Sequence, residues 1–168
     1  FRDFGDTTFS TDINPTHVYN SIGIKTVTLI VTTNNGCSDT VTRTLIVSPL
    51  PETDFSVGPT CFGNPTDFTN LTTIAFGTTT YLWNFGDGVT DTAANPSHTY
   101  TVLGNYTVTL TVTSNAGCMD VSSQVITVHP NPTADFIAAN VCEDDSVLFD
   151  NNSTVPYGTL TSFWEFGD

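Results

Sequence analysis

The sequence predicts an all-β fold, and three observations support this class. Thr makes up about a fifth of the 168 residues and aromatic residues another 11%, and both are favoured in strands. Gly and Pro recur at short intervals, as turns between short strands require. Residues 106–113 alternate between apolar or aromatic side chains and Thr, which is the period of a half-buried strand.

The expected strands follow one another most regularly in residues 52–129. The longest has the alternating face of residues 106–112, and a turn at Ser114–Gly117 leads into the returning strand. Six or seven short strands in about 78 residues predict two antiparallel sheets packed as a sandwich, with Trp83 and Phe85 between them. The expected strands are 54–57, 66–70, 81–85, 98–100, about ten residues around 106–113, and 118–128.

The chain repeats itself at an offset of 81 residues without a gap. Of the 49 positions from Phe1 to Pro49, 21 are identical to the residue 81 positions further on. Such self-similarity is the signature of a tandem array of one structural unit. The matching stretches are LWNFGD (82–87) with FRDFGD (1–6) and FWEFGD (163–168), NPSHTY (95–100) with NPTHVY (14–19), GNYTVTLTVTSNAGC (104–118) with GIKTVTLIVTTNNGC (23–37), and PNPTADF (130–136) with PLPETDF (49–55).

Two Pro-x-Pro stretches, Pro49–Pro51 and Pro130–Pro132, mark the boundaries between repeats, because Pro stiffens a linker and cannot continue a strand ladder. We therefore expect a partial repeat at 1–48, a complete repeat at 52–129 and a second partial repeat at 133–168. The first partial repeat has the C-terminal part of the unit and the second has the N-terminal part. Two explanations stay open: the chain is a piece of a longer array, or the partial repeats complete each other between molecules.

The net charge of −14 limits the partners of this chain, since only Arg2, Lys25 and Arg43 are basic. Such a surface repels phosphate backbones and anionic lipids, so nucleic-acid and membrane-surface binding are not expected. No run of eighteen apolar residues predicts a membrane span. The opening FRDFGD has neither the apolar core nor the cleavage site of a signal peptide, so we expect any export signal outside this segment.

The ordered motifs W-x-F-G-D-G, N-P-x-H-x-Y and G-x-Y-x-V-x-L-x-V resemble the PKD domain, the repeat of polycystic kidney disease protein. This resemblance covers the chain as one full and two partial repeats, and it implies an immunoglobulin-like fold. The N-x-G-C turn is similar to repeats in secreted surface proteins of gliding bacteria. Arg2, Lys25 and Thr7 depart from the pattern, standing where the family has Trp, Tyr and Gly. We therefore expect the core of the first repeat to depart from the family pattern, unless the aliphatic stems of Arg2 and Lys25 lie along apolar surface.

Two cysteines per repeat in a chain expected to be exported indicate a disulfide framework. Within one repeat the pair is Cys61–Cys118, and closing that loop would stabilise the fold by about 4 kcal/mol in the chain-entropy model. The rival pairing joins Cys37 to Cys61 and Cys118 to Cys142, across each linker. The intra-repeat bridge is the prediction.

Asp87 and Asp91 are candidate calcium ligands, but their spacing lacks the alternating acids of a dedicated calcium loop. Asp87 before Gly88 is chiefly a turn signal, so no metal site and no cofactor is expected. His98 and His17 precede a Tyr by two residues, and we expect each imidazole to be packed at a sheet corner with its nitrogens bonded to backbone. A Ser97–His98–Asp87 catalytic group lacks any nucleophile motif, so no enzyme activity is predicted.

The resemblance also implies modification. Gliding bacteria of that phylum O-glycosylate secreted proteins at Asp-(Ser/Thr) followed by a small aliphatic residue or Thr. Four matches make glycan sites at Thr7, Thr40, Thr92 and Ser146 a hypothesis. The motif is short, and a Thr-rich chain also produces it by chance.

The resulting prediction is a non-catalytic extracellular stalk of stacked sandwiches, part of a large bacterial cell-surface adhesin. Adhesion and gliding motility follow from the resemblance alone. The partners expected are the neighbouring repeats of the same chain, with any surface polysaccharide or protein bound through other domains. The alternative is a carbohydrate- or protein-binding accessory module of a secreted hydrolase, for which the loop aromatics Phe62, Phe76 and Tyr157 are candidate contacts.

Overall fold

The structure is a computed structural model that describes residues 1–167. These residues contain thirteen strands and no helix, which confirms the predicted all-β class. A helix that could cross a membrane is absent from this part of the chain. The strands are β1 (Arg2–Asp3), β2 (Phe9–Ser10), β3 (Gly23–Thr32), β4 (Ser38–Val47), β5 (Phe55–Val57), β6 (Pro65–Asn70), β7 (Thr79–Asn84), β8 (Thr90–Asp91), β9 (Ser97–Thr99), β10 (Gly104–Ser114), β11 (Met119–Val128), β12 (Phe136–Ala138) and β13 (Phe149–Asn151).

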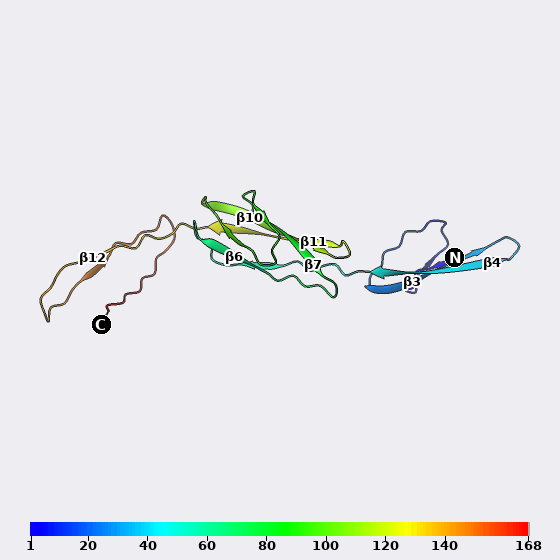
Figure 1. Cartoon of the computed structure of the whole chain (residues 1–168), viewed down its shortest axis with the longest axis horizontal. Coiled ribbons are helices and arrows are strands. Elements are labelled where there is room, and N and C mark those ends of the chain that lie inside the picture. Colours follow the sequence, from blue (N-terminus) through cyan, green and yellow to red (C-terminus); the bar gives the residue numbers. More distant parts are fainter. Residues whose placement is uncertain (168) are drawn as a thin grey trace. The chain divides into compact units, whose positions relative to one another are not determined.

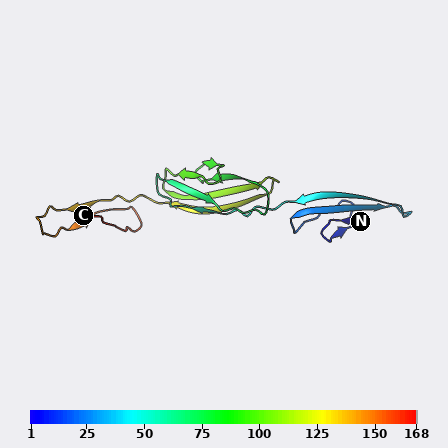
Figure 2. The same cartoon turned by 60° about the horizontal axis from the view of Figure 1, so that its bottom comes forward.

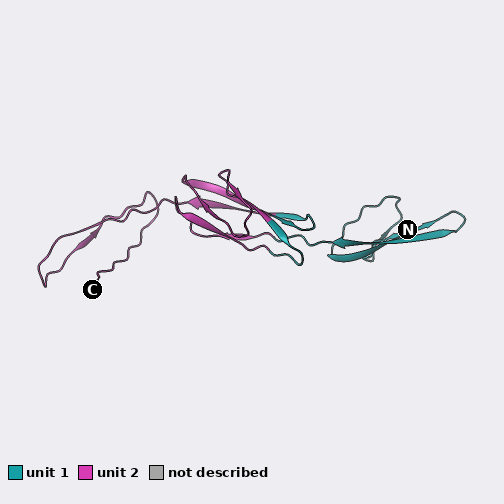
Figure 3. Ribbon diagram, viewed as in Figure 1, with its two compact units in different colours: residues 1–52, 73–80, 112–120 teal, residues 53–72, 81–111, 121–168 magenta. Residues whose placement is uncertain are grey.

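The chain divides into two compact units, coloured separately in Figure 3. Unit 1 consists of residues 1–52, 73–80 and 112–120, and therefore contains the first repeat together with short ends of β7, β10 and β11. Unit 2 consists of residues 53–72 and 81–111 and the chain from residue 121 onward. The unit boundary thus differs from the repeat boundary of the sequence.

The middle repeat is an antiparallel β-sandwich of two sheets (Figures 1 and 2). One sheet has the strand order β11-β10-β7-β8 and the other the order β5-β6-β9. The short edge strand β8 was not predicted, because a strand of two residues has no periodicity to detect. The remaining strands of this repeat match the expected ones, and their alternation sends Val108, Leu110 and Val112 inward, where all three are fully buried.

Aromatic side chains join the two sheets of the middle repeat. The Trp83 ring on β7 lies 5.1 Å from Phe55 on β5 and 5.6 Å from Phe68 on β6, measured between ring centroids. The Trp83 Nε1–H donates a hydrogen bond of 3.0 Å to the carbonyl oxygen of Ala93, so the buried indole has no unpaired polar atom. Trp83 and Phe85 are therefore core residues, as predicted.

The first repeat is a single four-stranded sheet with the order β2-β1-β3-β4. Its long hairpin pairs β3 with β4 in ten register positions, from Gly23↔Val47 to Thr32↔Ser38 (Figure 2). Phe4 is buried, and Arg2, which replaces Trp, is half-buried. Lys25 donates a hydrogen bond of 2.7 Å to the Ser21 hydroxyl, and its ammonium lies 5.9 Å from the Tyr19 ring centroid. Lys25 is half-buried, and these contacts hold its ammonium group.

The glycine of each F-G-D motif is required by the backbone beside it. Gly86 has φ +85°, and a Cβ there would lie 2.7 Å from the carbonyl oxygen of Thr107 on β10. Gly5 repeats this in the first repeat, where the Cβ would lie 2.5 Å from the carbonyl oxygen of Thr26. By contrast, Gly88 has φ +93° and open space around it, and its counterpart Thr7 keeps a φ of 74° at the expense of backbone strain.

We predict that Gly86→Ala destabilises the middle repeat more than Gly88→Ala does. Both substitutions place a Cβ on a left-handed residue, which costs roughly 1–2 kcal/mol. Only the first also forces a methyl group against the β10 backbone. Equilibrium denaturant unfolding of the two variants compares their free energies of unfolding, and equal values would contradict this account of the motif.

Candidate functional site

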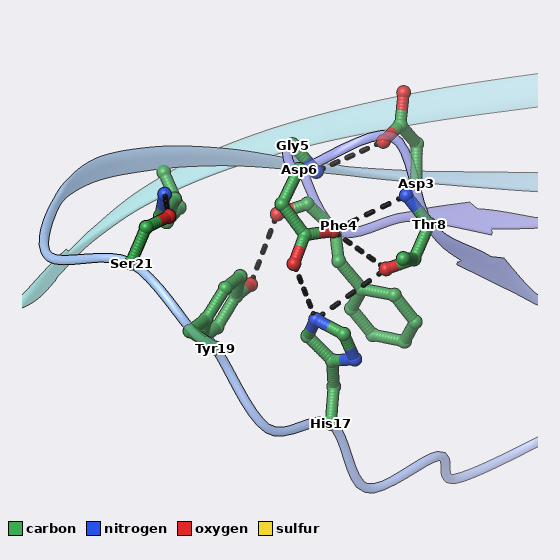
Figure 4. A network of polar contacts seen from close by, with 9 residues as sticks. Asp3, Phe4, Gly5, Asp6, Thr8, His17, Tyr19 and Ser21 are labelled. Atoms are coloured by element: carbon green, nitrogen blue, oxygen red, sulfur yellow. Dashed lines mark hydrogen bonds and ion pairs between the residues drawn. The ribbon is translucent and has the colours of Figure 1, made fainter.

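A corner of aromatic and polar side chains occurs in both the first and the middle repeat. We call it the Asp–His corner, and it consists of Phe85, Asp87, His98 and Tyr100 in the middle repeat. The turn after β7 supplies Phe85 and Asp87, and β9 with the residue after it supplies His98 and Tyr100. The counterparts in the first repeat are Phe4, Asp6, His17 and Tyr19, shown in Figure 4.

The geometry of the corner is nearly the same in both copies. His98 Nε2 lies 2.7 Å from Asp87 Oδ2, and the imidazole stacks on Phe85 with a centroid distance of 4.3 Å and an interplanar angle of 4°. The Tyr100 hydroxyl donates a hydrogen bond of 3.0 Å to the Phe85 carbonyl oxygen. In the first repeat the equivalent distances are 2.7 Å, 4.2 Å and 3.0 Å (Figure 4). The corner is thus a repeated structural element.

The carboxylates of the corner are held in their charged form. Partial burial raises the pKa of Asp87, but hydrogen bonds from His98 and from the Val89 amide outweigh it, so the pKa lies below its ordinary value. Hydrogen bonds from Thr8 and His17 lower the pKa of Asp6 to about 2. Burial raises the pKa of the Tyr100 phenol, with Asp87 as a further cause, so Tyr100 stays a hydrogen-bond donor.

The prediction that backbone groups satisfy the histidine nitrogens is wrong for Nε2, which contacts a carboxylate in both copies. Contact between His98 and Asp87 joins residues eleven positions apart, and no spacing rule in the sequence indicates it. Since the motif repeats with both residues present, their shared recurrence is the signal that could have paired them.

The corner lacks the arrangement of a catalytic triad. In a triad the carboxylate holds one imidazole nitrogen and the nucleophile uses the other. Here the Thr8 hydroxyl lies 3.4 Å from His17 Nε2, the same nitrogen that Asp6 contacts. The Thr8 hydroxyl donates its hydrogen bond to Asp6 Oδ1. Ser97 precedes His98 in β9, so their side chains leave opposite faces of the strand.

The two calcium candidates are used in turns. Asp87 Oδ1 accepts the Val89 amide at 3.1 Å, and Asp91 Oδ1 accepts the Ala93 amide at 2.7 Å. Among residues 1–167, no group of three or more His, Cys, Asp or Glu side chains is placed to hold a metal ion.

None of the four cysteines forms a disulfide in the structure, and the predicted Cys61–Cys118 bridge is not present in it. The backbone of Cys61 forms an isolated parallel β-bridge with His129, the residue directly after the end of β11. Cys118 directly precedes the first residue of the same strand. A ten-residue strand spans roughly 33 Å, whereas a disulfide requires Cα atoms within about 7 Å. Spacing in the sequence did not indicate which end of β11 each cysteine adjoins. The rival bridges through Cys37 and Cys142 are likewise absent.

All four hydroxyl residues of the glycosylation hypothesis, Thr7, Thr40, Thr92 and Ser146, are exposed. Exposure is required for modification but does not test it, so glycosylation stays a prediction. The loop aromatics Phe62, Phe76 and Tyr157 are 41%, 45% and 50% exposed.

Sequence reasoning missed a second candidate surface, the outward side of the β11-β10-β7 part of the middle repeat. Thr109 and Ser123 face each other across β10 and β11, with their hydroxyl oxygens 3.0 Å apart. In the first repeat the counterparts Thr28 and Thr42 are 3.5 Å apart. We call this surface the outer face. Its members in unit 2 are Leu82, Thr107, Thr109, Thr111, Val121, Ser123, Val125 and Thr127.

We predict that the middle repeat loses stability as the pH falls below about 4. The pKa of Asp87 is depressed in the folded state, so its contribution is complete above the unfolded value of about 3.9 and is lost as the pH falls through the lower folded value. Asp87→Asn should lower the unfolding free energy at pH 7 by roughly 1 kcal/mol and flatten this pH dependence. Asp91→Asn, which keeps the His98 contact, should leave the slope intact. Thermal unfolding followed by circular dichroism between pH 7 and pH 2 measures both variants.

We also predict that Cys61 and Cys118 do not cross-link in the folded monomer. A chain with Cys37→Ser and Cys142→Ser is treated with oxidised glutathione, and any mixed disulfides between glutathione and protein are then selectively reduced. Cys61 and Cys118 should both remain as free thiols. Thiol counting by mass spectrometry after alkylation checks this. An internal disulfide in the folded monomer would contradict the strand positions above.

The PKD domain family model matches residues 2–47 and 51–128. Collagenase ColA of Bacillus cereus is 38% identical over 80 residues, which cover 48% of this chain and 7% of the collagenase. Pre-pro-metalloprotease PrtV of Vibrio cholerae is 36% identical over 93 residues, which cover 48% of this chain and 10% of the metalloprotease. The chain thus spans a small part of the length of these curated relatives.

Two solved structures of single domains are also similar. The PKD1 domain of Vibrio anguillarum Epp matches with a TM-score of 0.47 and 28% identity, covering 51% of this chain and 100% of that chain. The PKD1 domain of Vibrio cholerae PrtV matches with a TM-score of 0.43 and 36% identity, covering 49% and 98%. Because the family model covers more than half of the sequence, the chain belongs to the PKD domain family, as tandem, non-catalytic, immunoglobulin-like β-sandwich repeats.

Proposed function

We propose that these PKD repeats are an accessory module of an extracellular hydrolase and bind its polymeric substrate. The observation that carries this proposal is the 38% identity to a collagenase and the 36% identity to a metalloprotease, each confined to a small part of the relative. A domain that makes up only a small part of proteolytic relatives supports a role in binding rather than in the reaction itself.

The outer face is the surface best suited to such binding. Its apolar members Leu82, Val121 and Val125 are 48%, 54% and 70% exposed. The other five members carry hydroxyl groups, and none of the eight is charged, although the whole chain has a net charge of −14. A flat sheet that combines methyl and hydroxyl groups without charge fits an extended, uncharged stretch of polymer, which it can contact through apolar packing and hydrogen bonds.

An extended protein is the polymer class that the relatives favour, since both are named as enzymes that act on proteins. Polysaccharide is the competing class and is tested alongside it. In either case the module works outside the cell, where its acidic surface keeps it soluble.

The stalk of a cell-surface adhesin is the second candidate function. It is favoured by tandem repetition itself and by the Pro49–Pro51 linker, in which Pro51 is fully buried. A rigid spacer needs no binding face, so the exposed valines of the outer face favour the first candidate. Glycans at Thr7, Thr40, Thr92 and Ser146 belong to the stalk proposal, and an intact mass equal to that of the bare sequence would reject them.

We predict that the chain adsorbs to insoluble collagen fibres through the outer face. Val125→Glu places an unpaired carboxylate in the contact and should weaken adsorption at least roughly tenfold, because 1.4 kcal/mol is a factor of ten and burying a lone charge costs more than that. Thr69→Glu adds the same charge on an exposed position of β6 in the opposite sheet and should change adsorption little. Depletion of protein from the supernatant measures binding.

Cellulose and chitin powders serve as the polysaccharide arm of the same assay. Adsorption to these alone would move the proposal from protein to carbohydrate. If the unaltered chain adsorbs to none of the three polymers, the stalk becomes the better explanation.

A further inference from the structure

The middle repeat has one long strand whose outer edge is unpaired. Its two sheets end in four edge strands, β11, β8, β5 and β9. Three of these are only two or three residues long, which limits what can pair with them. The fourth, β11, has ten residues, and β10 is its only partner strand in the described part of the chain. Residues 119–128 contain no Lys and no Pro, the residues that commonly protect such an edge.

The C-terminal end of this edge already accepts a further strand. Cys61 forms a parallel bridge with His129, the residue directly after β11. The His129 N–H donates a hydrogen bond of 2.9 Å to the Thr60 carbonyl oxygen, and the Phe62 N–H donates one of 2.8 Å to the His129 carbonyl oxygen. The Thr60 hydroxyl donates to the Thr127 carbonyl oxygen. Residues 60–62 thus lie beside the end of β11 as an added strand.

These bonds establish which backbone groups of β11 point away from β10. The peptide groups of successive residues in a strand point to opposite sides, so alternate residues share a side. Since Thr127 bonds to the segment 60–62, the N–H and C=O groups of Val121, Ser123 and Val125 point to that same side. Within residues 1–167, no strand or loop backbone pairs with these three residues there.

The chain before residue 60 belongs to the other sheet and leaves this part of the edge open. Residues Phe55–Val57 form β5, which pairs with β6. A side chain links the two sheets at this point, since Gln124 Nε2 donates a hydrogen bond to the Phe55 carbonyl oxygen. Gln124 shares its side of β11 with the buried Ile126. The core is therefore closed beneath the edge, while the backbone of residues 121–125 remains accessible to a partner.

The charge of the middle repeat favours a cationic partner at this edge. Residues 52–129 contain six Asp and Glu and neither Lys nor Arg. Asp54 is exposed and directly precedes β5, which the Gln124 contact places beside β11. The same edge of a second copy would bring another wholly acidic repeat to this place, which is unfavourable. An extended segment that carries Lys or Arg is instead attracted by these carboxylates.

We propose that the free edge of β11, residues 121–125, binds an extended polypeptide segment bearing Lys or Arg as an added strand. Main-chain hydrogen bonds supply the affinity in this binding mode, and the charges of the segment supply the selectivity. A polysaccharide has no main-chain amide ladder and does not fit this edge. The inference goes beyond the proposed function, because the outer face contacts a polymer through side chains and the edge contacts a peptide through backbone groups.

Fluorescence anisotropy of a labelled synthetic peptide tests the proposal on the whole 168-residue chain. The peptide alternates Lys with Val and is long enough to span residues 121–125. It should bind, and its binding should weaken as salt is added. The same peptide with Glu in place of Lys should bind at least tenfold more weakly. Equal binding of the Lys and Glu peptides, or binding of neither, would overturn the proposal.

Two further peptides separate strand addition from attraction between charges. Both keep the Lys and Val sequence, and one carries N-methyl groups on all Val amides while the other carries them on all Lys amides. Each therefore lacks one of the two rows of N–H donors and retains the full charge. At least one of them should bind tenfold or more weakly than the unmethylated peptide. If all three bind equally, charge alone holds the peptide and no strand is added.

Val121→Pro locates the contact on the protein. Pro removes an N–H that points outward, and it is tolerated at an edge because the bonds to β10 come from the neighbouring residues. Peptide binding should weaken at least tenfold. Val121→Ala is the matched control, since it shortens the side chain but keeps the N–H, and it should bind within about twofold of the unaltered chain. Equal loss in both variants, or no loss in Val121→Pro, would contradict binding through the backbone.

Hydrogen exchange followed by NMR tests the same point without any substitution. In the free chain the amides of Val121, Ser123 and Val125 should exchange fast, whereas those of Ser122 and Gln124, which point to β10, should be protected. Adding the Lys peptide should protect the three outward amides. Their continued fast exchange in the complex would overturn the proposal. Protection that instead rises with the concentration of the chain alone would identify a second copy as the occupant and would overturn it as well.

Discussion

Contact of the Trp83 indole with Phe55 and Phe68 is the interaction on which the middle repeat depends. These rings come from different sheets, so their packing is what makes two sheets one sandwich. Burying an aromatic side chain of this size is among the largest favourable terms available to a domain of about 80 residues. The neighbouring turns, glycines and polar corner keep the Trp83 strand in position. Similar ring distances recur around Trp164 of the third repeat, where β12 pairs with β13.

Much of the fold could be predicted because strand alternation and exact repetition are local properties of a sequence. The period of two in residues 106–113 specified the inward face of β10, and the 81-residue offset identified the repeating unit. The contacts that could not be predicted join distant residues. His98 meets Asp87 only because β9 passes the turn after β7, and Cys61 lies beside His129 only because of where β11 ends. Spacing along a chain reports neither fact, which is why the histidine partner was predicted wrongly and why a Cys61–Cys118 bridge was expected.

The Asp–His corner shows why motif chemistry must be judged by geometry. A carboxylate, an imidazole and a hydroxyl are all present in the first repeat, and they converge on a single imidazole nitrogen. That convergence favours a fixed, charged aspartate and leaves no activated nucleophile. The hydroxyl is itself replaced by Val89 in the middle repeat, so even the composition of the group varies between copies while its packing does not. Function is thus better sought on the sheet surfaces, which the core leaves free to vary.

Thr7 gives the first repeat a turn with more backbone strain than the same turn of the middle repeat. Its φ of 74° is the left-handed backbone that Gly88 adopts freely in the next repeat, so the first turn stores strain that the second lacks. When an array of such domains is pulled at its ends, the tension is the same in every link, and the link with the lowest barrier gives way first. Similar domains that differ in turn strain therefore unfold one after another when the array is stretched. Each unfolding step lengthens the array and absorbs work.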